Sequence, residues 1–279
     1  LSHMIMRLER EQSVKEYLNI MDHRKTEQLI DTLDKVEQNR KECYIREFSI
    51  EHFHDSKVFE TLIPKICKIF REENEELTGF ENEEILAEYQ IYKTPGYVYM
   101  KGNVQIYSAG KQAADISAFP EGIAVAVGSE EDAPDICVDQ TIDKVFTIEN
   151  LTSFYRFKQE HSLVIYLGGY HNHSRRNLLM QIYQKLPDAQ YYHFGDLDAG
   201  GFYILEHLKR KTGIPFQMFQ MDIETLKKYE DYAKPLTEND KKRLMQLEKM
   251  ELPDEERKLI TYMLQKGIKL EQECISESQ

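Results

Sequence analysis

The second half of the chain alternates short apolar runs with segments of helical periodicity. Between the runs, apolar residues recur at helical spacing, as at Leu178, Leu179 and Ile182. Strands that alternate with helices in this way form right-handed βαβ units, so the pattern predicts an α/β fold with a parallel sheet flanked by helices. The predicted strands cover residues 145–148, 163–167, 190–194 and 214–219.

The first half of the chain has a less regular pattern. A charged segment with apolar positions at helical spacing predicts a helical arm. Beyond it we expect a strand over Glu42–Ile50, then a helix from the Asp55–Ser56 N-cap to about Arg71, and a hairpin over Tyr97–Tyr107. The chain therefore divides into three predicted parts: a helical arm at 1–40, a smaller α+β region at 41–142, and a sheet domain with a C-terminal helical extension at 143–279.

Composition narrows the class of protein. The chain has 279 residues, of which 41% are hydrophobic, and a formal net charge of −13. That charge argues against simple electrostatic binding of nucleic acid, but not against an enzyme with a local basic surface and metal ions. Four scattered cysteines without a CxxC pair are typical of reduced cytosolic thiols.

No apolar run is long enough for a membrane span and no signal peptide is evident, so we expect a cytoplasmic protein without a membrane partner. The segment Leu1–Met4 resembles the scar left by removal of an expression tag, and the natural chain is expected to extend further upstream.

Three acidic residues follow predicted strands and carry the candidate chemistry. Glu149 comes after the first strand of the sheet domain, and Asp196 and Asp198 follow the third. The carboxyl ends of parallel strands meet at one edge of a sheet, where ligand sites collect. An oxygen-rich anionic cluster suits Mg²⁺ or Mn²⁺, which can orient water and neutralise charge in phosphodiester chemistry.

Other interpretations of these acids stay open. Asp196 could cap the following helix while Asp198 is simply solvated. A P-loop is excluded because the chain has no GxxxxGK[ST] motif. Past the fourth strand, Asp222 is a weaker candidate ligand.

The acidic motifs resemble the Toprim domain shared by primases, topoisomerases and some nucleases. The similarity is greater to one branch, the carboxy-terminal portion of the JetD family, topoisomerase VI A-like nuclease subunits of Wadjet anti-plasmid systems. It covers most of the chain from about residue 30. The motifs that carry it are 45–50, 55–57, 147–150, 195–202 and 270–273.

The resemblance implies a Toprim fold and a Mg²⁺- or Mn²⁺-dependent endonuclease that cuts double-stranded plasmid DNA. It also implies a homodimer that works with an SMC-like condensin complex of the JetABC type. By the match of motifs, Glu149, Asp196 and Asp198 are the catalytic and metal-binding residues. Glu271 and Glu273 match a late acidic motif and either complete the metal site or lie on a solvated helix face.

One departure from the family pattern bears on mechanism, and the residues after the second strand have more than one interpretation. Topoisomerase VI A subunits cut DNA with an upstream tyrosine, and this chain offers no convincing equivalent, so we expect hydrolysis by an activated water. Arg175 and Arg176, after the second strand, either hold DNA phosphate or solvate a helix N-terminus, and metal binding by His171 and His173 is the weaker reading. The alternative function is a non-catalytic Toprim-like subunit that binds nucleic acid or partner proteins.

Overall fold

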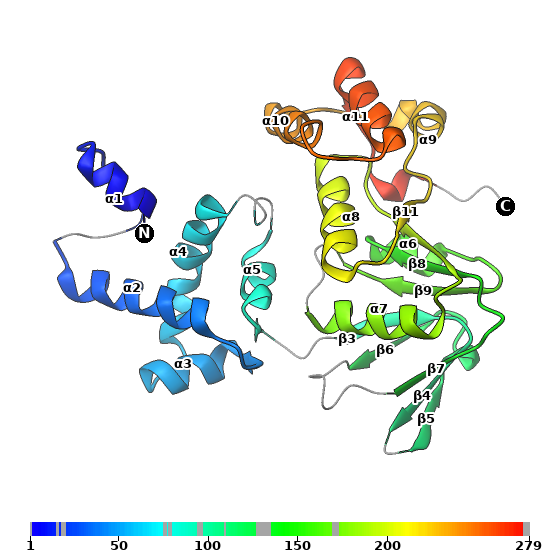
Figure 1. Ribbon diagram of the computed structural model, residues 1–279, viewed down its shortest axis with the longest axis horizontal. Helices are drawn as coiled ribbons and strands as arrows, with labels where there is room; N and C mark the ends of the chain where they lie inside the picture. The colour runs from blue at the N-terminus through cyan, green and yellow to red at the C-terminus, as the bar shows by residue number, and fades with distance from the viewer. Residues whose placement is uncertain are drawn as a thin grey trace. The chain divides into compact units, whose positions relative to one another are not determined.

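The computed structural model describes residues 2–14, 17, 21–74, 77, 80–93, 97–108, 110–126, 135–168 and 173–275 (Figure 1). The chain forms two compact units, Leu1–Pro95 and Gly96–Gln279. The predicted boundary at 142/143 falls inside the second unit, because strands from 97–126 join the main sheet. The predicted turn at 95–96 lies outside the described residues. None of the described helices is long and apolar enough to cross a membrane.

The first unit is mostly helical. Its core is made by large apolar side chains with almost no exposed surface, including Phe48, Phe59, Ile66 and Leu86. A short parallel strand pair brings β1, in the middle of the unit, beside β2 near its C-terminal end. The described elements are α1 (Ser2–Glu9), α2 (His23–Gln38), β1 (Cys43–Tyr44), α3 (Ile45–Phe53), α4 (Val58–Glu73), α5 (Asn82–Glu88) and β2 (Ile91–Tyr92).

The predicted strand over Glu42–Ile50 is wrong beyond its first residues. Only β1 is extended, and α3 begins at Ile45. The carboxylate of Glu47 accepts a hydrogen bond from the Tyr44 N–H at 2.8 Å, which satisfies a donor at the start of the helix. Ile45, Phe48 and Ser49 are buried at helical rather than alternating spacing. The next helix is confirmed, although its N-cap is Lys57.

The second unit is built on a six-stranded sheet with the order β11-β10-β8-β9-β3-β6. The four strands from β11 to β9 are parallel, whereas β3 pairs antiparallel with both β9 and β6. The α/β class is therefore confirmed, with a mixed sheet. The strands are β3 (Tyr97–Lys101), β6 (Ile123–Ala126), β8 (Lys144–Ile148), β9 (Ser162–Tyr166), β10 (Gln190–Phe194) and β11 (Gln217–Met218).

The predicted hairpin over Tyr97–Tyr107 is also wrong. Both edges of β3 are occupied, one by β9 and the other by β6, so no edge remains for the following strand. That strand enters a separate three-stranded antiparallel sheet with the order β5-β4-β7. Its members are β4 (Val104–Ser108), β5 (Lys111–Asp115) and β7 (Asp135–Val138).

Helices cover the main sheet, and a helical C-terminal layer packs beside α8 (Figure 1). The predicted helix after the third strand is confirmed as α8, which ends at Gly213. The remaining elements are α6 (Leu151–Arg156), α7 (His173–Lys185), α8 (Ala199–Thr212), α9 (Ile223–Lys228), β12 (Lys234–Pro235), α10 (Glu238–Leu247), α11 (Asp254–Lys266), β13 (Ile268–Lys269) and the 3₁₀ turns η2 (Ile116–Ala118), η3 (Glu230–Tyr232) and η4 (Gln272–Cys274).

A buried lysine fixes the end of α6 to the sheet. Lys101 is 7% exposed, and its ammonium donates to the carbonyl oxygens of Phe154 and Phe157, both at 2.6 Å. These carbonyls belong to the last turn of α6 and the residue after it, where a helix has no internal donors for them. The helix that follows Glu149 is thereby held in place.

We expect Lys101→Met to lower the free energy of unfolding by about 2–4 kcal/mol, because it leaves buried carbonyl groups without a donor. Urea denaturation measures the change. The exposed Lys111 of β5 provides the control, since Lys111→Met should stay within about 0.5 kcal/mol of the original chain. Equal stability of the two variants would contradict the assigned role of Lys101.

Candidate active site

The strand order reverses direction at β8. The chain passes from β8 to β9 on one side, then crosses to β10 on the other side of β8. In open α/β sheets, ligands bind beyond the carboxyl ends of the strands at such a switch point. Ile148 and Phe194, the last residues of β8 and β10, are paired. Glu149 and the segment from Gly195 therefore leave the sheet side by side.

The Glu149 carboxylate lies over the start of that segment. Its Oε2 accepts a hydrogen bond from the Asp196 N–H at 3.3 Å. A β-carbon at Gly195 would stand 2.6 Å from this oxygen and 2.8 Å from Nε2 of His193. A larger residue at this position would displace the Glu149 carboxylate or the His193 ring, because real β-carbons do not approach so closely.

Asp198, not Asp196, caps the following helix. Its Oδ1 accepts from the N–H of Gly201 at 2.9 Å, so one of its oxygens already serves α8. A β-carbon at Gly201 would lie 2.1 Å from the carbonyl oxygen of Asp196, and this close approach holds the Asp196–Asp198 turn against the helix. Asp196 is left free of capping and directs its carboxylate to another partner.

That partner is the C-terminal clasp, which we define as residues 270–273. Leu270 exchanges two backbone hydrogen bonds with Leu197, at 2.9 and 3.1 Å. The N–H of Gln272 then donates to Oδ1 of Asp196 at 2.7 Å. The clasp is thus attached directly to the turn that carries both aspartates.

Gln272 ties the two strand ends together. Its side chain is fully buried; Nε2 donates to the Phe194 carbonyl at 3.0 Å, and Oε1 accepts from the Asn150 N–H at 2.8 Å. One side chain from the far end of the sequence therefore bridges the residue before Gly195 and the residue after Glu149. Sequence reasoning missed it, because neutral glutamine in a polar motif carries no chemical signal of its own.

The two late glutamates differ in their surroundings. Oε1 of Glu273 accepts from Nδ2 of Asn150 at 2.5 Å, which brings its charge toward the strand ends. Glu271 forms an ion pair with Lys234 at 2.5 Å, and both of these side chains are largely exposed. The structure therefore brings Glu273 close to the predicted site, while Glu271 is engaged with a lysine at its margin.

The acids repel one another strongly. Burial, together with the negative charges of Asp196, Asp198 and Glu273, raises the pKa of Glu149 to about 8. Burial also raises the pKa of Asp196 to about 6, against the opposing effect of the Gln272 N–H and with the help of neighbouring acids. Without added positive charge, Glu149 is protonated at neutral pH.

The carboxylates of Glu149, Asp196 and Asp198 are chemically suited to a hard divalent cation. Carboxylate oxygens are the ligands that Mg²⁺ and Mn²⁺ prefer, and the charges acting most on Glu149 are all negative. Among the described residues, however, no group of three His, Cys, Asp or Glu side chains is gathered around one point at ligand distances. Glu149, Asp196 and Asp198 would have to draw their oxygens together around an ion.

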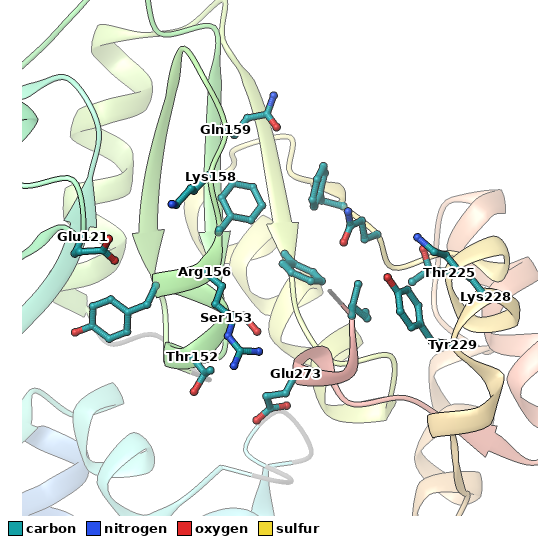
Figure 2. Close-up of a pocket in the computed structure, with 16 residues that line it drawn as sticks. Glu121, Thr152, Ser153, Arg156, Lys158, Gln159, Thr225, Lys228, Tyr229 and Glu273 are labelled. Carbon is teal, nitrogen blue, oxygen red and sulfur yellow. The ribbon is translucent and has the colours of Figure 1, made fainter. Parts of the chain in front are cut away.

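A cavity of about 800 Å³ lies beside Glu273 (Figure 2). Phe194 and Glu273, which flank the site on β10 and the clasp, are among the residues that line it. Its wall also includes residues of α6, the two residues after β11 and residues of α9. The cavity therefore reaches the acidic site through Phe194 and Glu273, and its volume is within the size range of ligand sites in proteins.

Comparison with known proteins decides the family. Residues 132–279 match the model of the family described as Wadjet protein JetD, C-terminal. The chain belongs to this family. It is also 29% identical over 263 residues to the Wadjet protein JetD of Bacillus cereus (strain Q1), an alignment that covers 92% of this chain. The chain spans 63% of the length of that relative.

All the candidate acids lie within the JetD C-terminal region. The resemblance read from the motifs is thereby confirmed at the level of the family. The first unit of the fold, which ends at Pro95, lies outside the residues that the family model matches. The alignment with the Bacillus cereus protein covers 92% of the chain and therefore includes most of this unit.

The predicted basic residues of the JetD C-terminal region are only partly accessible. Arg175 donates to the Leu167 carbonyl at 2.7 Å, beyond the end of β9, and Arg176 is 7% exposed. His171 lies outside the described residues, as does the side chain of His173. Asp222 caps α9 by accepting from the Thr225 N–H at 2.7 Å.

His193 lies beneath the acids and was also missed. It is fully buried, with Nδ1 3.0 Å from Oγ1 of Thr147, and its Nε2 has no hydrogen-bond partner in the described part of the chain. Burial lowers its pKa to about 3, so the imidazole is neutral. The alternation of strand side chains, which places 193 and 195 on one face with 147 and 149, would have indicated this position.

The pKa of Glu149 predicts how stability depends on pH. The folded pKa of about 8 exceeds the usual value of 4.5, so the folded state binds more protons between these values. The free energy of unfolding should therefore fall as pH rises from about 4.5 to 8. Asp196 acts in the same direction, between 3.8 and about 6.

Glu149→Gln keeps an acceptor for the Asp196 N–H but removes this ionisation. In EDTA at pH 8, we expect the variant to be more stable than the original chain by about 1–3 kcal/mol. The difference should shrink toward zero near pH 4.5. Urea unfolding at several pH values measures it, and a variant that is less stable across the whole range would show that Glu149 has a compensating positive charge.

Proposed function

We propose that this chain is a metal-dependent DNA endonuclease that hydrolyses phosphodiester bonds at a Toprim-type acidic site. The single observation that carries the proposal is the convergence of Glu149, Asp196 and Asp198 on the switch point between β8 and β10. Their number, their position and their mutual repulsion suit a divalent cation, Mg²⁺ or Mn²⁺. Their membership in the JetD C-terminal region supports the same chemistry.

Each residue has a distinct role in this proposal. A divalent cation, when bound, would neutralise charge on the scissile phosphate. Asp196 and Asp198 would hold it, with Glu273 as a further oxygen ligand at the rim. Glu149 would take a proton from the attacking water; because its pKa is about 8 without a cation, the nearby positive charge would have to ionise it first. Gln272 positions Asp196 and the strand ends.

The relatives supply the biological setting of the proposal. The similar protein of Bacillus cereus is a Wadjet protein JetD, and we infer a role for this chain in Wadjet defence. The substrate would then be double-stranded plasmid DNA in the cytoplasm. The partners would be a second copy of the chain and an SMC-like condensin complex.

A second function is favoured by one observation. Asp198 already caps α8, and the described acids are not gathered at ligand distances. A Toprim-like subunit that binds nucleic acid or partner proteins without cutting would tolerate this arrangement. The two functions differ in whether the carboxylates are needed for cleavage.

The test is nicking of circular plasmid DNA in Mn²⁺, with and without excess EDTA. We expect Glu149→Gln and Asp196→Asn each to lower the cleavage rate by a factor of about 100 or more, because they remove a base and a ligand. Asp188→Asn is the matched control, since this exposed acid lies at the opposite end of β10 and should leave the rate unchanged.

The outcomes separate the two functions. Cleavage that survives EDTA or both active-site substitutions would refute the assigned site. If the original chain cleaves only when the motor partners are added, the substitutions should be compared in that complex. No cleavage there, together with retained DNA binding, would establish the non-catalytic function.

A further inference from the structure

The cavity beside the acids has its own chemical character. It is lined by residues of the segment 152–159, the two residues after β11, α9 and the C-terminal segment (Figure 2). None of the residues assigned to the cation lines it except Glu273. It is therefore a neighbouring space rather than the acidic site itself.

The wall of the cavity is locally basic. Arg156, Lys158 and Lys228 line it, against two acids, Glu121 and Glu273. Figure 2 shows Arg156 and Lys158 on one side of the space and Lys228 on the other. The residues that line the cavity thus carry one more positive than negative charge, in a chain with a net charge of −13, which suits an anionic ligand.

Aromatic residues line much of the cavity; Phe219 is partly exposed, whereas Phe157, Phe194 and Tyr229 are less than 10% exposed. The ring of Phe219 lies 5.6 Å from that of Phe157 and 5.8 Å from that of Phe194, and Tyr229 closes the other side. Flat aromatic faces beside cations are the combination with which proteins bind unpaired nucleotides, the rings stacking on bases and the cations contacting phosphates.

Gln220 adds a polar group at the same place. Its Oε1 is buried and has no hydrogen-bond partner among the described residues, and its backbone is left-handed, with φ of 53°. Both features cost stability in the unliganded protein, and such costs concentrate at functional sites. An amide in this position can pair with the edge of a base.

The cavity and the acidic site share a wall. Glu273 lines the cavity while its Oε1 accepts from Asn150, the residue after Glu149. Phe194 also lines it and directly precedes the Gly195–Asp198 turn. A DNA strand with a phosphate at the acids would therefore place its adjacent nucleotide at the mouth of the cavity.

We propose that this cavity binds one unpaired nucleotide of the DNA strand, next to the phosphate at the acidic site. Arg156, Lys158 and Lys228 hold its backbone phosphates, the rings of Phe219 and Tyr229 contact the base, and the Gln220 amide pairs with the base edge. The inference rests on the proposed function. It narrows the substrate from double-stranded DNA in general to DNA whose two strands are locally separated.

The test is binding of a short single-stranded oligodeoxynucleotide that carries 2-aminopurine, in EDTA so that no cleavage occurs. Stacking in the cavity should quench the fluorescence of the probe. We expect Lys228→Glu to raise the Kd about tenfold or more. Lys227→Glu is the matched control: it makes the same charge change on the next residue, which lies over the Tyr262 ring and not in the cavity, and should change the Kd less than about twofold.

A second variant separates binding from folding. Gln220→Gly removes the amide but relieves the left-handed backbone, so it should weaken binding and quenching while the Tm stays equal or rises. Equal effects of the Lys228 and Lys227 substitutions would overturn the proposal, as would quenching that Gln220→Gly leaves intact. Normal plasmid cleavage without binding of the probe would refute the nucleotide-binding role of the cavity and leave the proposed nuclease intact. Probe binding without plasmid cleavage, even with the motor partners added, would refute the nuclease and leave the cavity's role intact.

Discussion

The site depends on one constraint, which is that acidic side chains are held close together where they are buried. Glu149 and Asp196 emerge from neighbouring strands, and the sheet pairing that sets their separation is fixed by the apolar core beneath them. Repulsion and desolvation raise both pKa values. In the proposed function a bound cation would remove this cost, which would link metal binding to stability and to chemistry.

Several local features allow the carboxylates to approach. Gly195 leaves space for the Glu149 carboxylate, and Gly201 lets α8 begin directly beneath Asp196. Lys101 anchors the end of α6, the helix that follows Glu149. In the clasp, the Gln272 N–H then donates a hydrogen bond to the Asp196 carboxylate. Three distant parts of the chain therefore hold one pair of strand ends.

Much of the sheet domain could be predicted from periodicity. The runs that became β8, β9 and β10 are mostly apolar and mostly buried, as is typical of strands covered on both faces. The topology of parallel strands places the acids that follow β8 and β10. The helix α8 was equally clear, because an N-cap precedes it and glycine ends it.

The remaining features depend on tertiary structure. The position of β3 in the sheet is set by its pairing with β9 and β6, which no local pattern reveals. The start of α3 depends on the hydrogen bond that the Glu47 carboxylate accepts from the Tyr44 N–H. Gln272 acts through contacts with residues more than 70 positions away in sequence, such as Asp196, at a separation of 76. Its role could not be read from spacing or residue type.

The most direct test of the central claim is an anomalous difference map from crystals of the full chain soaked in Mn²⁺. We predict one strong peak within ligand distance of the carboxylates of Asp196 and Asp198, with the Glu149 carboxylate beside it and still accepting from the Asp196 N–H. A map without a peak there, or with its only peak elsewhere on the protein, would contradict the assignment of this sheet edge as a cation site.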